Sequence, residues 1–194
     1  MYMEIREITK VIAGYTFRGA VKPDTSGHIF VFQAKDLIQG EPVVDISTLT
    51  KISHDVPGYT GHLKKNDVLL VARGMKAGSF RSTVFASDAD NVIASSSVHI
   101  IRATDPRILP EFISLYLNSK EGQEAISQIV TGSYIGAVPR KELERLKIPL
   151  LPLERQKTFI ELDQNIREQQ RITNKQNEIR QNIINATFRN LIIT

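Results

Sequence analysis

The longest regular pattern of hydrophobic positions lies in the last quarter of the chain. Two prolines, Pro149 and Pro152, precede it, and neither glycine nor proline follows. Because proline is tolerated in a first helical turn but breaks a helix interior, one uninterrupted helix can run from Leu153 to about Arg189. At 1.5 Å per residue this helix would be about 55 Å long, which exceeds the usual globular helix.

The apolar residues of this helix form a narrow stripe, in two sets that differ in phase. The phase changes near Gln169, and amides at Gln169, Gln170, Gln176 and Asn177 stand where a plain leucine zipper would have leucine. A long helix cannot bury so narrow a stripe alone, so we expect it to pair with another helix as a coiled coil. The alternative is a helix docked on its own domain. The residues expected at the dimer or partner interface are Phe159, Leu162, Ile166, Ile172, Ile179 and Ile183.

The rest of the chain changes from a strand-like pattern to a helix-like one. After two prolines, residues 110–130 have helical spacing and predict two short helices that divide near Gly122. The pattern indicates an α+β fold, with a β-rich domain over residues 1–150 and a long helical arm over residues 151–194. Runs of β-branched and aromatic residues predict strands over 29–33, 68–72, 83–86 and 92–101, the last interrupted by serines at 95–97.

Composition sets outer limits on the function. The chain has 194 residues, 41% of them hydrophobic, which suffices for one domain with a core and an appendage. It has no cysteine, hence no disulfide and no thiolate metal site. We see neither a signal peptide nor an apolar run of about 18 residues, and we expect a cytoplasmic protein without a membrane span. The net charge of +4 is weak support for a polyanionic partner.

Motifs of catalysis and cofactor binding are absent from the sequence. The four histidines have no close metal-ligand spacing. His54 and Asp55 form an HD pair, and residues 74–79 have the composition of a phosphate loop, but neither has the further residues that such sites need. There is also no GxSxG or GxGxxG pattern. The sequence therefore favours a protein that is not an enzyme.

Basic, glycine-containing loops are the stronger candidates for function. From Lys64 to Arg81, five cations stand against one acid, Asp67. Glycine and serine in such a segment let backbone N–H groups and cations approach the phosphates or base edges of DNA. The alternative for each loop is an ordinary solvated hairpin loop. The candidate DNA-binding residues are Arg18, Lys22, Lys64, Lys65, Arg73, Lys76, Ser79, Arg81, Ser82 and Tyr134.

Four segments, taken in order, resemble the specificity subunits of type I restriction–modification systems. IREITKVIAGYTFRG, from Ile5, resembles the opening of a target-recognition domain, and LKKNDVLLVARGMKAGSF, from Leu63, resembles the family's strand and loop. LPEFISLYLNSKEGQEAI, from Leu109, resembles its helix and the one that follows. GSYIGAVPRKELERLKIPLLPLERQ, from Gly132, resembles the hallmark before the long helix and is the most specific of the four.

The chain departs from the family's pattern in three respects. Asn66 stands where glycine is usual, and the segment 153–156 has ERQ where EQ is typical. A full subunit has two recognition domains and two long helices, whereas this sequence has one of each and resembles the half-length members.

The resemblance implies a non-catalytic subunit that recognises double-stranded DNA. Its domain would bind one half of an interrupted site, and its helix would act as a spacer and dock methyltransferase subunits, which the restriction subunit joins. S-adenosylmethionine, ATP and Mg²⁺ would belong to those partners, and no cofactor to this chain. With one domain and one arm, we expect a homodimer with antiparallel arms. The alternative is a coiled-coil adaptor whose head does not bind DNA.

Overall fold

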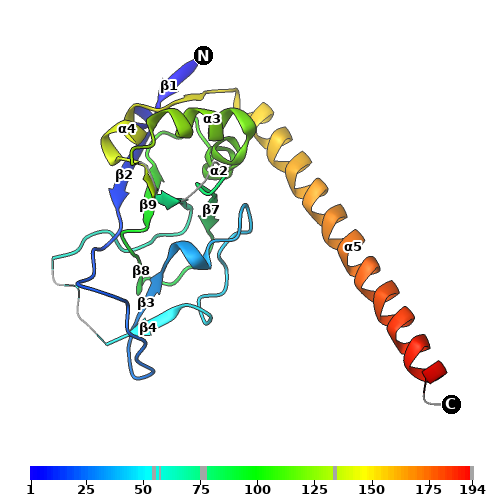
Figure 1. Ribbon diagram of the computed structural model, residues 1–194. Coiled ribbons are helices and arrows are strands. Elements are labelled where there is room, and N and C mark those ends of the chain that lie inside the picture. The colour runs from blue at the N-terminus through cyan, green and yellow to red at the C-terminus, as the bar shows by residue number, and fades with distance from the viewer. Residues whose placement is uncertain (54–55, 57, 75–77, 133–134, 193–194) are drawn as a thin grey trace. The chain divides into compact units, whose positions relative to one another are not determined.

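The chain forms two units in the computed structural model, which describes residues 1–53, 56, 58–74, 78–132 and 135–192 (Figure 1). The first unit is Met1–Gln156 and the second is Lys157–Thr194. The first is a mixed α+β domain and the second continues one long helix, so the predicted α+β fold class is confirmed. The sequence suggested a boundary after residue 150, whereas the compact domain extends to Gln156, a fully buried residue.

A four-stranded antiparallel sheet forms the centre of the domain. The apolar strand β5 (Asp67–Val71) is buried along its whole length. Helix α2 (Pro110–Asn118) contacts β5 and β7 (Ser82–Phe85), and a core cluster that includes Leu69, Phe85 and Ile100 also packs on the sheet. Burial of each such side chain contributes about 1.5–3 kcal/mol. The strand order is β2 (Thr9–Ala13), β9 (Val98–Ala103), β5 (Asp67–Val71) and β7 (Ser82–Phe85).

A smaller mixed sheet packs beside the first. The segment 92–101, predicted as one interrupted strand, is two strands in two sheets. The Ser97 hydroxyl accepts a 3.1 Å hydrogen bond from the Ala34 N–H and lies 2.7 Å from the Ser95 hydroxyl. The serines at 95–97 therefore lie where the chain leaves the smaller sheet and enters the central one. The order is β4 (Thr50–Ile52), β3 (Ile29–Phe32) and β8 (Val92–Ala94), with β3 antiparallel to β4 and parallel to β8.

Three helices, α2 (Pro110–Asn118), α3 (Lys120–Ile129) and α4 (Arg140–Arg145), gather at the end of the domain opposite β3 and β4 (Figure 1). The division between α2 and α3 was predicted near Gly122 and lies instead at Ser119. The Ser119 hydroxyl caps α3 by accepting from the Gly122 N–H at 3.1 Å. A side chain at residue 122 would collide with the α2 backbone, so glycine at this position allows close packing of the two helices.

The remaining short elements are α1 (Ile5–Ile8), η1 (Ala34–Asp36) and two ribbons, β1 (Tyr2–Glu4) with β11 (Lys147–Pro149) and β6 (Arg73–Gly74) with β10 (Gly136–Ala137).

The turn before β5 explains why asparagine can stand at position 66. Its φ of 72° lies in the left-handed region, which glycine adopts freely and asparagine tolerates better than most residues. The Asp67 carboxylate accepts from the Lys64 N–H at 2.7 Å, and the Asp67 N–H donates to the Lys64 carbonyl at 2.9 Å. The departure from the glycine of the family pattern therefore preserves the turn.

Helix α5 (Leu153–Ile192) has 40 residues and confirms the predicted uninterrupted helix. Pro152 immediately precedes it, and the Arg155 and Gln156 N–H groups donate to the Pro152 carbonyl at 2.9 and 3.1 Å. None of the described helices has a segment long and apolar enough to cross a membrane. Whether α5 pairs as a coiled coil stays a prediction.

Candidate nucleic-acid interface

The short ribbon of β6 and β10 joins two glycine-containing loops that are far apart in the sequence. Gly74 lies opposite Gly136, and Arg73 opposite Ala137. The Val138 N–H extends the contact by donating to the Ala72 carbonyl at 2.9 Å. A side chain at Gly74 would collide with Ser79 of its own loop, and one at Gly136 would collide with Val130 and crowd the Gly74 carbonyl, so both positions suit glycine. The basic loop after β5 and the hallmark segment thus form one surface.

The cations predicted to bind DNA near β5 differ in their position and availability. Arg73 and Arg81 lie at the end of β5 beside this surface, and Lys64 and Lys65 at the other end. Lys64 and Arg73 are exposed, and Arg81 is partly exposed. No carboxylate of the described residues forms an ion pair with these three cations. Lys65 is also exposed but forms a 2.9 Å ion pair with Asp88. Lys64, Arg73 and Arg81 are therefore the better candidates for contacts with phosphate.

The remaining predicted residues near this loop separate into three groups. Ser82 is fully buried, and its hydroxyl donates to the Ser114 carbonyl at 2.9 Å, so it offers no surface to DNA. This corrects its assignment as a contact residue; the cause is that β7 begins at Ser82 and is covered by α2. Ser79 is partly exposed. Lys76 and Tyr134 lie outside the described residues.

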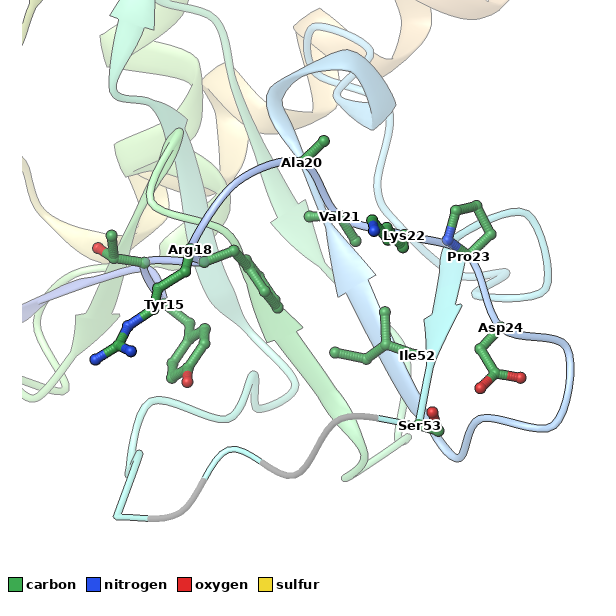
Figure 2. A pocket seen from close by; sticks show the side chains of 11 residues that line it. Tyr15, Arg18, Ala20, Val21, Lys22, Pro23, Asp24, Ile52 and Ser53 are labelled. Atoms are coloured by element: carbon green, nitrogen blue, oxygen red, sulfur yellow. The ribbon is translucent and has the colours of Figure 1, made fainter.

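Arg18 and Lys22 line a separate hollow of about 1110 Å³, between the loop of residues 15–24 and strand β4 (Figure 2). The Tyr15 N–H holds one end of the loop by donating to the Ala94 carbonyl at 2.7 Å. The Asp24 N–H holds the other end by donating to the Lys51 carbonyl at 2.9 Å. The loop that lines the hollow is thus held at both edge strands of the smaller sheet.

The wall of the hollow combines aromatic rings with charged side chains. The Tyr15 ring lies edge-to-face against Phe17 and Tyr59, with centroids 4.8 and 5.4 Å apart. Arg18 and Lys22 are exposed. Hydrogen bonds from Ser26 and Ser53 lower the pKa of Asp24, which is therefore ionised at neutral pH. Two cations and one carboxylate leave a small positive charge, which suits a phosphate or sugar contact with DNA.

A buried ion pair supports the strands beneath these loops. Arg102 in β9 donates from Nε and Nη2 to the two carboxylate oxygens of Asp67 in β5, each at 2.7 Å. Arg102 also donates to the His62 carbonyl at 2.9 Å, which anchors the segment that carries Tyr59. Burial raises the pKa of Tyr59 to about 12, so its hydroxyl stays protonated and donates to the Ala13 carbonyl at 3.1 Å.

His99 connects the central sheet to the hallmark segment. Its side chain is buried in β9, and Nε2 lies 2.7 Å from the Val138 carbonyl, to which it donates. Nδ1 has no hydrogen-bond partner within the described part of the chain. Burial lowers the pKa of His99, and the nearby Arg140 adds to this effect. The imidazole is therefore neutral at physiological pH.

Acidification is expected to destabilise the domain through His99. Because its pKa in the folded state is below the unfolded value of about 6.5, the unfolded chain binds the proton more readily. The stabilisation is complete above about pH 6.5 and is lost as the pH falls through the folded-state pKa, by at most about 1.4 kcal/mol per pH unit. Urea unfolding at about pH 7.5 and about pH 5.5 measures this loss. The loss of stability on acidification should be smaller in His99→Gln and unchanged in His28→Gln. If His99→Gln loses as much stability as the wild type, another group causes the loss.

Neither the ion pair nor His99 was identified from the sequence as important. The partners of Arg102 and His99 lie 35 and 39 residues away along the chain, and no local pattern indicates them. Tyr59 likewise joins Tyr15 and Phe17 only through the fold. Among the described residues, no group of three or more histidine or acidic side chains could hold a metal ion.

Comparison with solved structures shows what the fold resembles. The HsdS subunit from Thermoanaerobacter tengcongensis has a TM-score of 0.59 and 18% sequence identity, covering 87% of this chain and 37% of that one. A structure described as explaining complex assembly and conformational transition of the type I R-M system has a TM-score of 0.59 and 17% identity, covering 87% of this chain and 38% of that one. These likenesses show the fold, and the chain spans less than two fifths of either structure's length.

Sequence comparison assigns the family. No curated protein matches the chain. The family described as "Type I restriction modification DNA specificity domain" matches residues 1–182. This match includes the domain, both candidate DNA-binding regions and most of α5. The chain therefore belongs to the type I restriction–modification DNA specificity domain family.

Proposed function

We propose that this chain is the non-catalytic DNA-recognition subunit of a type I restriction–modification complex. Its domain, Met1–Gln156, binds one half of an interrupted DNA site as a target-recognition domain, and α5 serves as the spacer arm. The observation that carries the proposal is the family match over residues 1–182. The joining of two glycine-containing loops supports it, because accessible cations lie beside them that have no ion-pair partner in the described part of the chain, and such cations can contact phosphates.

Two parts of the domain surface are proposed to contact DNA. Arg73 and Arg81 form the first, at the end of β5 beside the β6–β10 ribbon, because they are accessible and have no ion-pair partner among the described residues. Lys64 shares these properties but lies at the other end of β5. Arg18 and Lys22 form the second, where the hollow can receive a phosphate or sugar. Ser79 lies near the first part, Lys65 is next to Lys64 at the other end of β5, and Lys76 and Tyr134 are retained from the sequence alone.

The partners follow from the same proposal. The chain docks methyltransferase subunits, the restriction subunit joins through them, and two copies of the chain form a homodimer. S-adenosylmethionine, ATP and Mg²⁺ are bound by those other subunits. The exposed apolar residues of α5 support the homodimer, because they are 49–61% accessible in the single chain from Phe159 to Ile183.

The variant Arg73→Ala/Arg81→Ala is expected to bind duplex DNA more weakly and with less dependence on salt. Each lost phosphate contact reduces the slope of log K against log salt by about 0.9, so two contacts reduce it by about 2. Fluorescence anisotropy of a random-sequence duplex, titrated at several salt concentrations, measures both quantities. A bidentate contact to guanine would instead relax the choice of site, by about 1–3 kcal/mol.

The matched control is Arg107→Ala/Arg145→Ala, which removes the same charge from two exposed local ion pairs. Its slope should stay that of the wild type. Equal reductions of the slope in both variants would show that the lower net charge of the protein, and not the loss of phosphate contacts, weakens binding. Absence of any salt-dependent DNA binding by the wild-type chain would favour the alternative, an adaptor whose head does not bind DNA. Mapping of methylated sites in a genome that carries the chain and its methyltransferase then identifies the bases recognised.

A further inference from the structure

The backbone on both sides of Arg81 is held by side-chain amides from two helices. The Gln123 side chain, in α3, donates from Nε2 to the Phe80 carbonyl at 2.9 Å. The Asn118 side chain, at the end of α2, accepts from the Ser82 N–H at 2.8 Å and donates to the Ser82 carbonyl at 2.9 Å. These three hydrogen bonds fix the residue before Arg81 and the residue after it.

Arg81 is the accessible residue of this short segment. Phe80 is 4% exposed and Ser82 is fully buried, whereas Arg81 is partly exposed. The Arg81 carbonyl accepts from the Val71 N–H at 2.9 Å, so the backbone of Arg81 is itself bonded to the end of β5. The guanidinium can therefore reach a ligand from a backbone that is held at three successive residues.

Asn118 takes the place of a neighbouring strand residue beside Ser82. A side-chain amide carries a donor and an acceptor, as a peptide unit does. Farther along β7, the corresponding contact comes from the backbone, because the Val43 N–H donates to the Val84 carbonyl at 2.9 Å. The amide thus continues the hydrogen bonding of β7 as far as the residue next to Arg81.

We propose that Asn118 and Gln123 are positioning residues for Arg81, whose backbone their amides hold in the place from which the guanidinium contacts a DNA phosphate. The inference rests on the proposed function and adds two uncharged residues that act through Arg81. A group held in its bound geometry loses less conformational freedom on binding, and so binds more tightly. Loss of either amide should therefore weaken DNA binding although no charge is removed.

The variant Asn118→Leu tests this role, because leucine has a similar size and no charge but cannot form the two hydrogen bonds to Ser82. It should weaken binding to a random-sequence duplex by on the order of 10-fold, as loss of one charge-assisted contact does. The slope of log K against log salt should also fall by up to about 0.9, the value for one phosphate contact. A purely structural role would leave this slope unchanged. Fluorescence anisotropy at several salt concentrations measures both quantities.

A double-mutant cycle with Arg81→Ala identifies the residue through which Asn118 acts. In the Arg81→Ala protein, Asn118→Leu should weaken binding by less than about twofold and should not lower the slope further. Additive losses, or an unchanged slope in Asn118→Leu alone, would overturn the positioning role and leave the Arg81 contact intact. If Arg81→Ala binds DNA as the wild type does, the contact itself is wrong, and the inference fails with it.

Two further variants separate positioning from stability. Gln123→Met removes the hydrogen bond to the Phe80 carbonyl and should behave as Asn118→Leu does in the same cycle, so it carries the test if circular dichroism shows that Asn118→Leu is unfolded. Gln156→Met is the matched control, because it removes a buried amide that bonds the backbone of other segments. It should lower stability and keep the slope of the wild type. An equal fall of the slope in Gln156→Met would overturn the positioning role.

Discussion

Replacing Arg102 with leucine should lower the free energy of unfolding of the recognition domain by about 3–5 kcal/mol. The Asp67 side chain is 1% exposed and both of its carboxylate oxygens accept from Arg102. Without the guanidinium, a buried carboxylate would lose its counter-charge and the His62 carbonyl would lose a 2.9 Å hydrogen bond. Urea denaturation followed by circular dichroism measures the change, with an unchanged m-value as the sign that the two-state transition is retained.

Arg107→Leu is the matched control for this variant. Arg107 also donates to both oxygens of a carboxylate, that of Asp105, but its side chain is 58% exposed. Its loss should change the free energy of unfolding far less than the loss of Arg102, because water screens an exposed pair. The double variant Asp67→Leu/Arg102→Leu should be more stable than Arg102→Leu, because it leaves no buried charge without a partner. If Arg102→Leu and Arg107→Leu cost the same, the buried pair is not the support that the structure indicates.

Replacing Gln156 with methionine should cost about 3–4 kcal/mol, although the two side chains have similar shape. Gln156 is fully buried in the first turn of α5. Its Oε1 accepts from the Leu109 N–H at 2.9 Å, and its Nε2 donates to the Arg107 and Leu151 carbonyls at 2.7 Å each. Methionine would leave these backbone groups without their partner. Urea denaturation measures the loss, and faster hydrogen exchange of the Leu109 amide locates it.

Gln164→Met provides the comparison on the same helix. Gln164 is exposed, so this change should alter stability by less than about 0.5 kcal/mol. Gln156→Glu should be at least as destabilising as Gln156→Met. Glutamate could still accept from Leu109, but it would place a negative charge against two carbonyl oxygens. A stable Gln156→Glu protein would show that solvent reaches this site and that the three hydrogen bonds are replaceable.

The α+β class and the long helix were predictable because each depends on a local pattern. The strands predicted over 68–72 and 83–86 are found at Asp67–Val71 and Ser82–Phe85, one residue earlier. Long apolar runs identify buried strands well, but the residue at which such a strand ends depends on how far the partner strand pairs with it. The same limit explains Ser82, whose polar side chain suggested a loop. Pairing with β5 and cover by α2 made it part of the core.

The candidate DNA-binding surface was only partly predictable. Arg73 and Arg81 were found from local clustering of cations, and the hallmark segment from its resemblance to a family. That Arg73 lies opposite Ala137 in one ribbon follows from strand pairing across more than 60 residues. The Lys65–Asp88 ion pair likewise appears only when two turns meet. A count of charges along the chain cannot distinguish an available cation from a paired one.

The sequence by itself determined the features that short-range physics controls. These are the helix after Pro152, the buried strands and the narrow apolar stripe along α5. Tertiary structure alone decided which polar groups meet in the interior. Arg102 finds Asp67, and Gln156 finds Leu109, across 35 and 47 residues. Such partners are selected because a buried polar group without a hydrogen bond is costly, and the register of strands and helices determines which groups come within reach.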